Sequence, residues 1–246
     1  MGSCAGWALA FLTQKIVLVP CSEWVWDALT FLRHRCASEV LLRSVSSSSG
    51  GNLRCFLPAV APLVAVARNG TQPELCTTAV KTLTLMLGDV GCNQAFVSLE
   101  GCGAVLLAME HAVKEYIEIA NRDSHSNGKV GLSQTAHDQQ DQNIGILTFL
   151  WRPRADEEIT AVTMRLAALI HDCGDCLVHA GKYEASRVGL RVVSGGSRLV
   201  HVLAGLSKTL AVDGALLSEP IPAMLLTALH ALLVLVQDTV VRQAFT

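Results

Sequence analysis

The fold is decided by the stretch NQAFVSLEGCG, residues 93–103. This short apolar segment ends in glycine. A glycine directly after a segment with helical periodicity marks the end of a helix. Before it, Pro73-Glu74 places a proline and an acid where the first turn of a helix favours them. After it, apolar residues recur at helical spacing from about Ala104 to Ala120. The stretch therefore predicts a short helical segment between two longer helices.

Two later segments echo this arrangement. Ala161 to Gly181 and Leu225 to the C-terminus each contain Ala and Leu at helical spacing, then a polar turn, then a short apolar segment. Gly101 and Gly181 are 80 residues apart, about twice the period of 40 found in armadillo and HEAT repeats. The third echo breaks off at Phe245. The chain is therefore expected to repeat one helical unit.

The pattern resembles the armadillo/HEAT-like α-helical repeat family, with its best match from Pro73 to Met109. The resemblance implies an all-α fold: an α-solenoid of stacked helical repeats, an armadillo-like superhelix whose groove binds extended peptides or helices. Alternating strand patterns are almost absent, which also favours all-α. Importin-like members carry Trp-x-x-x-Asn on their groove helices. That motif does not occur in this sequence, so nuclear import by that mechanism is unsupported.

The chain is expected to form a single armadillo-like helical domain, 1–246, with a polar, mobile insertion at about 121–143. A break is expected at Pro153 and a polar turn after Ile170. Outside the repeat phrase, helices are predicted over Gly6–Val19, Ser22–Val45, Leu57–Arg68 with a kink or restart at Pro62, Glu157–Ile170, Tyr183–Val193, Leu199–Val212 and Pro222–Val236.

The composition of the chain argues against several classes of function. Hydrophobic residues make up 51% and charged residues 16%, with a mean hydropathy of +0.41, so most helices must be buried against neighbours. The net charge is −2 without a basic stripe, which argues against nucleic acid. Nine cysteines at scattered spacing suit reduced thiols and a cytoplasmic location. No complete catalytic or phosphate-loop motif occurs in the sequence, so a non-enzymatic protein without a cofactor is expected.

One cluster has metal-ligand chemistry. His171, Cys173, Cys176 and His179 are all residue types that bind zinc. On one continuous helix they would spread over roughly 200° and could not converge on an ion, so zinc requires a break at Gly174. The preferred interpretation is that no metal binds and that the two cysteines are small apolar residues in a turn.

The N-terminus contains residues that could be acylated. Gly2 follows the initiator methionine, as N-myristoylation requires, and Cys4 could carry a second acyl chain. Position six is glycine instead of serine or threonine, and no basic cluster follows. A membrane partner is expected only if this segment is acylated.

The primary prediction is a non-enzymatic scaffold or adaptor that binds a partner protein through the solenoid groove. Two alternatives stay open: an acylated, membrane-tethered armadillo adaptor, and a zinc-binding protein using the cluster at 171–179. The sequence stops at Phe245-Thr246 in mid-phrase. The last helix is therefore expected to leave an apolar face open, in a fragment, a truncated isoform or a chain that associates with itself there.

Overall fold

The computed structural model describes residues 23–45, 53–69, 72–127, 142–213 and 221–236, and every element in these ranges is helical. The predicted all-α fold is therefore confirmed for this part of the chain. The elements in order are α2 (Glu23–Val45), η1 (Leu53–Ala59), α3 (Val60–Asn69), α4 (Pro73–Met86), α5 (Val90–Ser98), α6 (Gly101–Asn127), α7 (Gln142–Ala180), α8 (Glu184–Val192), α9 (Gly195–Asp213) and α10 (Ile221–Val236).

Local chemistry explains several helix starts. Helix α4 begins at Pro73, whose missing N–H costs nothing in a first turn, with Glu74 beside it near the positive end of the helix dipole. Helix α5 is capped by Asp89, whose carboxylate accepts a hydrogen bond from the backbone N–H of Cys92 at 3.1 Å. Pro62 lies in the first turn of α3, so the predicted restart of the helix there is confirmed.

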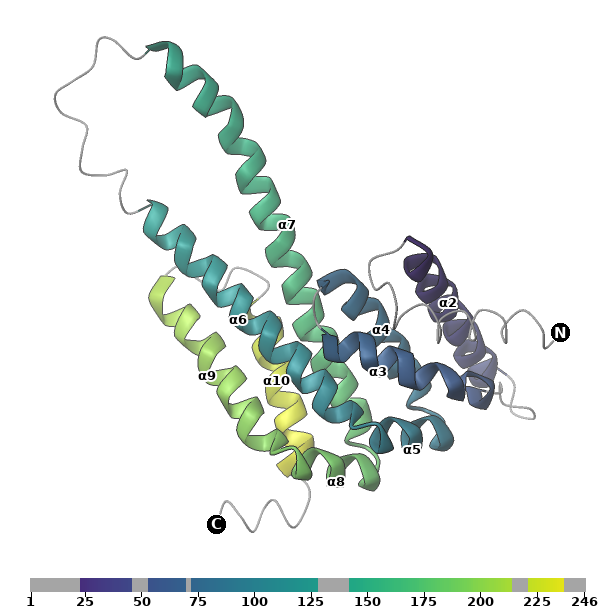
Figure 1. Cartoon of the computed structure of the whole chain (residues 1–246). Helices are drawn as coiled ribbons and strands as arrows, with labels where there is room; N and C mark the ends of the chain where they lie inside the picture. The colour runs from purple at the N-terminus through teal and green to yellow at the C-terminus, as the bar shows by residue number, and fades with distance from the viewer. Residues whose placement is uncertain (1–22, 46–52, 70–71, 128–141, 214–220, 237–246) are drawn as a thin grey trace.

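Helix α7 departs most from the predicted elements. It runs unbroken from Gln142 to Ala180, so the expected break at Pro153 and the expected turn after Ile170 are both wrong. A proline inside a helix removes one backbone hydrogen bond and strains the preceding turn, but the rest of a long helix can hold both segments together. In Figure 1 the first half of α7 extends beyond the other helices.

Both ends of the range 121–143, predicted as a polar, mobile insertion, are helical. Helix α6 continues to Asn127 instead of ending near Ala120, and α7 already begins at Gln142. Residues 128–141 lie outside the described residues. The predicted helix at Gly6–Val19 and the third echo of the repeat phrase, at 241–245, lie outside them as well.

Elements three places apart in chain order pack side by side (Figure 1). One row contains η1, α5 and α8; a second contains α3, α6 and α9; a third contains α4, α7 and α10, with α2 packed on α4. One core runs through all three rows, and its largest fully buried side chains include Leu29 on α2 and Leu169 on α7. The inner helices α6 and α7 thus each pack between an earlier and a later helix of their own row.

Neighbours within a row are parallel and in register. Between α6 and α9, Glu110 meets Arg198, and seven residues further along both helices Ile117 meets Gly205. From the first contact to the second, the residue number rises on both helices, so the axes of α6 and α9 are parallel. Seven residues are close to two helical turns, so the same faces meet again.

The turns that connect helices of different rows recur along the chain: the hydrogen bonds and backbone angles of one set are found again 94 residues later. Leu87 and Asp89 donate backbone hydrogen bonds to Leu83 and Met86, and Gly181 and Tyr183 donate in the same way to Leu177 and Ala180. Glu100 and Ser194, which precede α6 and α9, share the same left-handed φ of 56°.

This equivalence corrects the predicted alignment of the repeat. The counterpart of Gly101 is Gly195, which follows Ser194, and the counterpart of Gly181 is Leu87. The alignment failed because Cys176–Gly181 is the end of a long helix, whereas Phe96–Gly101 contains the end of a short one. Glycine is required at 101 because a Cβ there would overlap the ring of Phe96, which is completely buried.

Candidate functional site

The candidate site is the exposed side of the third row, which we call the α4–α7–α10 face. On α7 it consists of Met164, Ala168, His171 and Asp175, which recur every three or four residues and are exposed or half-exposed. Lys81 on α4 lies on one side of this stripe. His230 is an exposed residue of α10, the third helix of the row. The face is therefore built from residues far apart in the sequence.

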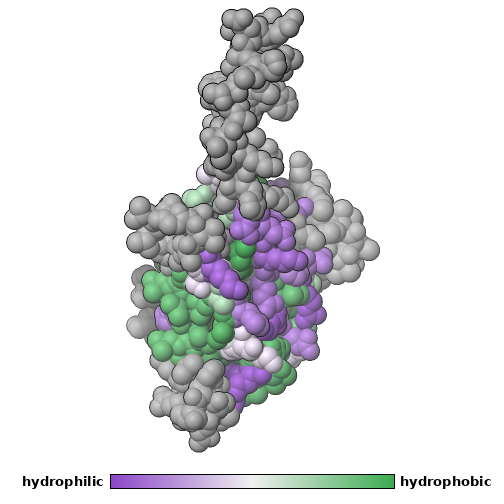
Figure 2. All heavy atoms as spheres, turned by 90° about the vertical axis from the view of Figure 1, so that its left-hand side faces the viewer, coloured by the Kyte–Doolittle hydropathy of each residue, from purple (hydrophilic) through white to green (hydrophobic). Residues whose placement is uncertain are grey.

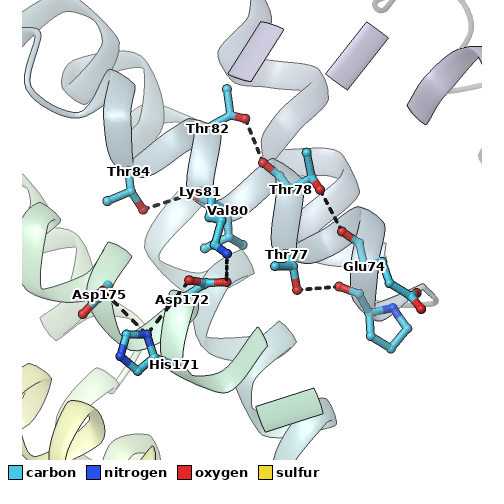
Figure 3. Close-up of polar contacts among 11 residues, drawn as sticks. Glu74, Thr77, Thr78, Val80, Lys81, Thr82, Thr84, His171, Asp172 and Asp175 are labelled. Atoms are coloured by element: carbon cyan, nitrogen blue, oxygen red, sulfur yellow. Dashed lines mark hydrogen bonds and ion pairs between the residues drawn. The ribbon is translucent and has the colours of Figure 1, made fainter. Parts of the chain in front are cut away.

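Two ion pairs hold α4 beside α7. Arg165 Nη1 lies 2.6 Å from Glu74 Oε1, and Lys81 Nζ lies 3.3 Å from Asp172 Oδ2. The second pair follows the first by seven residues on both helices, so the two helices are parallel here as well. Figure 3 shows Lys81 reaching from α4 to Asp172.

Asp172 is the most enclosed charged group of this cluster. Its side chain is 13% exposed. Burial raises its pKa above the ordinary carboxyl value, while Lys81 and then His171 act in the opposite direction. His171 Nδ1 lies 4.0 Å from Asp172 Oδ1 and 3.7 Å from Asp175 Oδ2 (Figure 3). A short chain of charged and polar groups thus runs from α4 across α7 to the half-exposed Asp175.

The threonines of α4 are satisfied within their own helix. The hydroxyls of Thr77 and Thr84 donate to the carbonyls of Pro73 and Val80 at 2.7 and 2.9 Å. Thr78 and Thr82 do the same at buried positions (Figure 3). These side chains line the helix without offering an unpaired donor, so the charged residues dominate the chemistry of the face.

The predicted zinc candidates do not converge. Cys173 and Cys176 are completely buried in the core, whereas His171 is half-exposed and His179 is exposed with its Nδ1 3.2 Å from the carbonyl oxygen of Asp175. Across the part of the chain that the structure describes, no three His, Cys, Asp or Glu side chains are grouped so that they could hold a metal ion.

The break at Gly174 that zinc binding would have required is absent, and packing explains why this glycine lies inside a helix. A Cβ on Gly174 would overlap Cγ2 of Thr227 on α10, so this glycine allows two helices to approach closely inside a continuous helix. Burial raises the pKa of Cys176 to about 12 and that of Cys173 well above the ordinary thiol value. Both cysteines are therefore core residues of α7, although the sequence placed them in a turn.

The acylation candidates Gly2 and Cys4 lie outside the described residues. Among the described helices, none is by itself long and apolar enough to cross a membrane. By length and composition alone, α5 and the first part of α6 pass that test as a pair bent by 69°.

A separate pocket of about 260 Å³ lies where α3, α6 and α9 meet, lined in part by Arg68, Glu100 and Arg198. Its charges are paired: Arg68 donates to the carbonyl of Leu99 at 3.0 Å and lies 3.6 Å from Glu100. Arg198 donates two hydrogen bonds to Glu110 at 2.7 and 2.6 Å. Both arginines are therefore engaged in contacts between neighbouring elements.

Reasoning from the sequence missed Lys81, Asp172 and the Glu74–Arg165 pair. The available signal was two opposite-charge pairs with the same seven-residue spacing on two predicted helices. That signal becomes readable only when the two helices are known to be neighbours. No known protein family, curated protein or solved structure matches this chain.

Proposed function

We propose that this chain is an armadillo-like α-solenoid that serves as a non-enzymatic scaffold or adaptor, and that it binds an extended or helical segment of a partner protein on the α4–α7–α10 face. The observation that carries the proposal is the parallel, in-register packing of α4 against α7 through Glu74–Arg165 and Lys81–Asp172. Parallel stacking of equivalent helices is how solenoids build one continuous binding surface.

The composition of the face suits this role. Met164 is 57% exposed and Ala168 is exposed, so a flexible apolar side chain and an open small position are available to a partner. His171 and Asp175 add hydrogen-bonding groups beside them. An apolar contact flanked by a few polar groups is typical of protein recognition surfaces.

A cytoplasmic location belongs to the same proposal. The cysteines in the described ranges are all free of disulfides, and most of them are buried. Unpaired thiols in a chain with this many cysteines suit a reducing compartment.

The test uses a photo-crosslinking amino acid at Ala168, with Gln94, exposed on α5, as the matched control position. A partner captured at Ala168 and absent at Gln94 is then purified and its affinity measured. We expect Ala168→Arg to weaken binding by about tenfold or more, because a long charged side chain would fill the contact. The same change at Gln94 should leave the affinity unaltered.

Two results would refute the proposed site. One is a partner that crosslinks only at the control position. The other is an affinity that Ala168→Arg leaves unchanged while the variant retains its helical circular dichroism. Turnover of a substrate by the purified chain, abolished by a substitution on this face, would overturn the non-enzymatic assignment.

A further inference from the structure

The exposed side of α10 is unusually apolar. Leu226, Leu229 and Leu233 are 70%, 51% and 57% exposed, and α10 contains no Asp, Glu, Lys or Arg. Val200 on the neighbouring helix α9 is 44% exposed. We call these four side chains, with the uncharged surface between them, the end face. Figure 2 looks at this side of the molecule and shows hydrophobic side chains gathered in one area at its lower left.

Helical geometry places these leucines away from the other helices. Thr227 and Val234 face α7, where they meet Gly174 and Gly181. Leu229, Leu233 and Leu226 lie about 200°, 240° and 260° around the helix from Thr227. Every other helix of the row has its counterpart surface covered by the next one: α4 by α7, and α7 by α10. On α10 that surface remains exposed.

We infer that the end face is a self-association surface, on which a second copy of this chain packs its own α10 across a two-fold axis. A two-fold axis brings each residue close to its own copy, so a charged face would repel itself. The end face has no charged side chain, and its leucines can interdigitate with their copies. Because these exposed side chains are apolar, packing against a second copy would remove them from water on both copies.

The available area is sufficient for a dimer. Helix α10 has 16 residues and is about 24 Å long. Two packed helices are about 20 Å wide, which gives roughly 480 Å² on each copy. Two copies together bury about 1,000 Å², the lower limit of specific protein interfaces. The expected dimer is therefore weak, with a dissociation constant on the order of micromolar.

The experiment measures molar mass by light scattering and sedimentation velocity on the full chain, from about 1 to about 100 μM. We expect the wild type to shift from monomer to dimer in this range. Leu229→Asp places two like charges near the axis and should weaken dimerisation by about thirtyfold or more. Leu41→Asp is the matched control, because Leu41 is 65% exposed on α2, far along the chain from this face, and should leave the dimer unchanged.

A second measurement does not depend on a destabilising substitution. His230→Cys, at an exposed position beside the leucines, should give a covalent dimer with a short bis-maleimide in a background with Cys4, Cys21 and Cys55 replaced by serine. Val192→Cys on α8, 79% exposed, should give none. A wild type that stays monomeric throughout, a dimer unaffected by Leu229→Asp, or open-ended oligomers in place of a dimer would each overturn the inference.

Discussion

Gly174 of α7 and Thr227 of α10 touch so closely that a Cβ on the glycine would overlap the threonine Cγ2. The contact explains how a glycine is accommodated inside a 39-residue helix, six residues before its end at Ala180. Seven residues later Gly181 makes the same kind of approach to Val234. The two glycines therefore set the distance between α7 and α10.

Gly174→Ala should destabilise the protein by about 1–3 kcal/mol, because the added methyl group overpacks the contact with Thr227. The same change in an open helical position normally stabilises by about 0.5–1 kcal/mol. Gly196 is the control, since nothing lies within 4 Å of its missing Cβ. Urea unfolding of both variants distinguishes the cases; a stable Gly174→Ala protein would mean that α10 does not pack here.

Lys81→Met should lower stability at pH 7 by about 1–3 kcal/mol, because Asp172 would be left as a largely enclosed carboxylate without its ammonium partner. Asp172→Asn in the same background should restore most of the loss. Glu100→Gln is the control from an exposed pair, in which Glu100 is 78% exposed, and should cost less than about 0.5 kcal/mol.

The Lys81→Met deficit should depend on pH in a defined direction. Burial raises the folded-state pKa of Asp172 above its unfolded value. A carboxyl group shifted this way loses stability as pH rises through the window between the two values. Removing Lys81 raises the folded pKa further, so the deficit should shrink as pH falls toward about 4. A deficit independent of pH would show that Lys81 acts through packing alone.

The buried thiols should resist alkylation. Burial raises the pKa of Cys176 to about 12, so almost no thiolate forms at pH 8, and no solvent reaches the sulfur. Of the seven cysteines that the structure describes, Cys55 is exposed and should react first. Peptide mapping after brief treatment with a maleimide tests this order. Modification of Cys173 or Cys176 as fast as Cys55 in the native protein would contradict the continuous, packed helix α7.

Arg198→Lys should cost about 0.5–1.5 kcal/mol, because lysine keeps the charge but cannot make both hydrogen bonds to Glu110. The side chains of this pair are only 24% and 29% exposed. Arg165→Lys changes a pair that is 54% and 36% exposed and should cost less. Thermal unfolding of the two variants side by side checks the ranking; equal losses would mean that burial does not distinguish the two pairs.

The sequence predicted well the elements that local chemistry defines. The starts of α2 and α4 follow from Ser22-Glu23 and Pro73-Glu74, and the short helix before Gly101 follows from its apolar pattern and terminal glycine. The predicted turn after Ile170 is absent, because Gly174 lets α10 pack closely against a continuous α7 instead of ending that helix. The four zinc candidates do not converge, as expected from the sequence for one continuous helix, because neighbours in sequence point to different sides of a helix.

The sequence by itself determined that the described chain is helical, since periodicity, caps and prolines act within a few residues of each other. Only the tertiary structure decided which helices are neighbours and in which register. Lys81 and Asp172 meet across α4 and α7, and nothing local in either helix specifies the other. Side-chain packing supplies that information: the faces that meet are those where glycines admit a neighbour and opposite charges align at a seven-residue spacing.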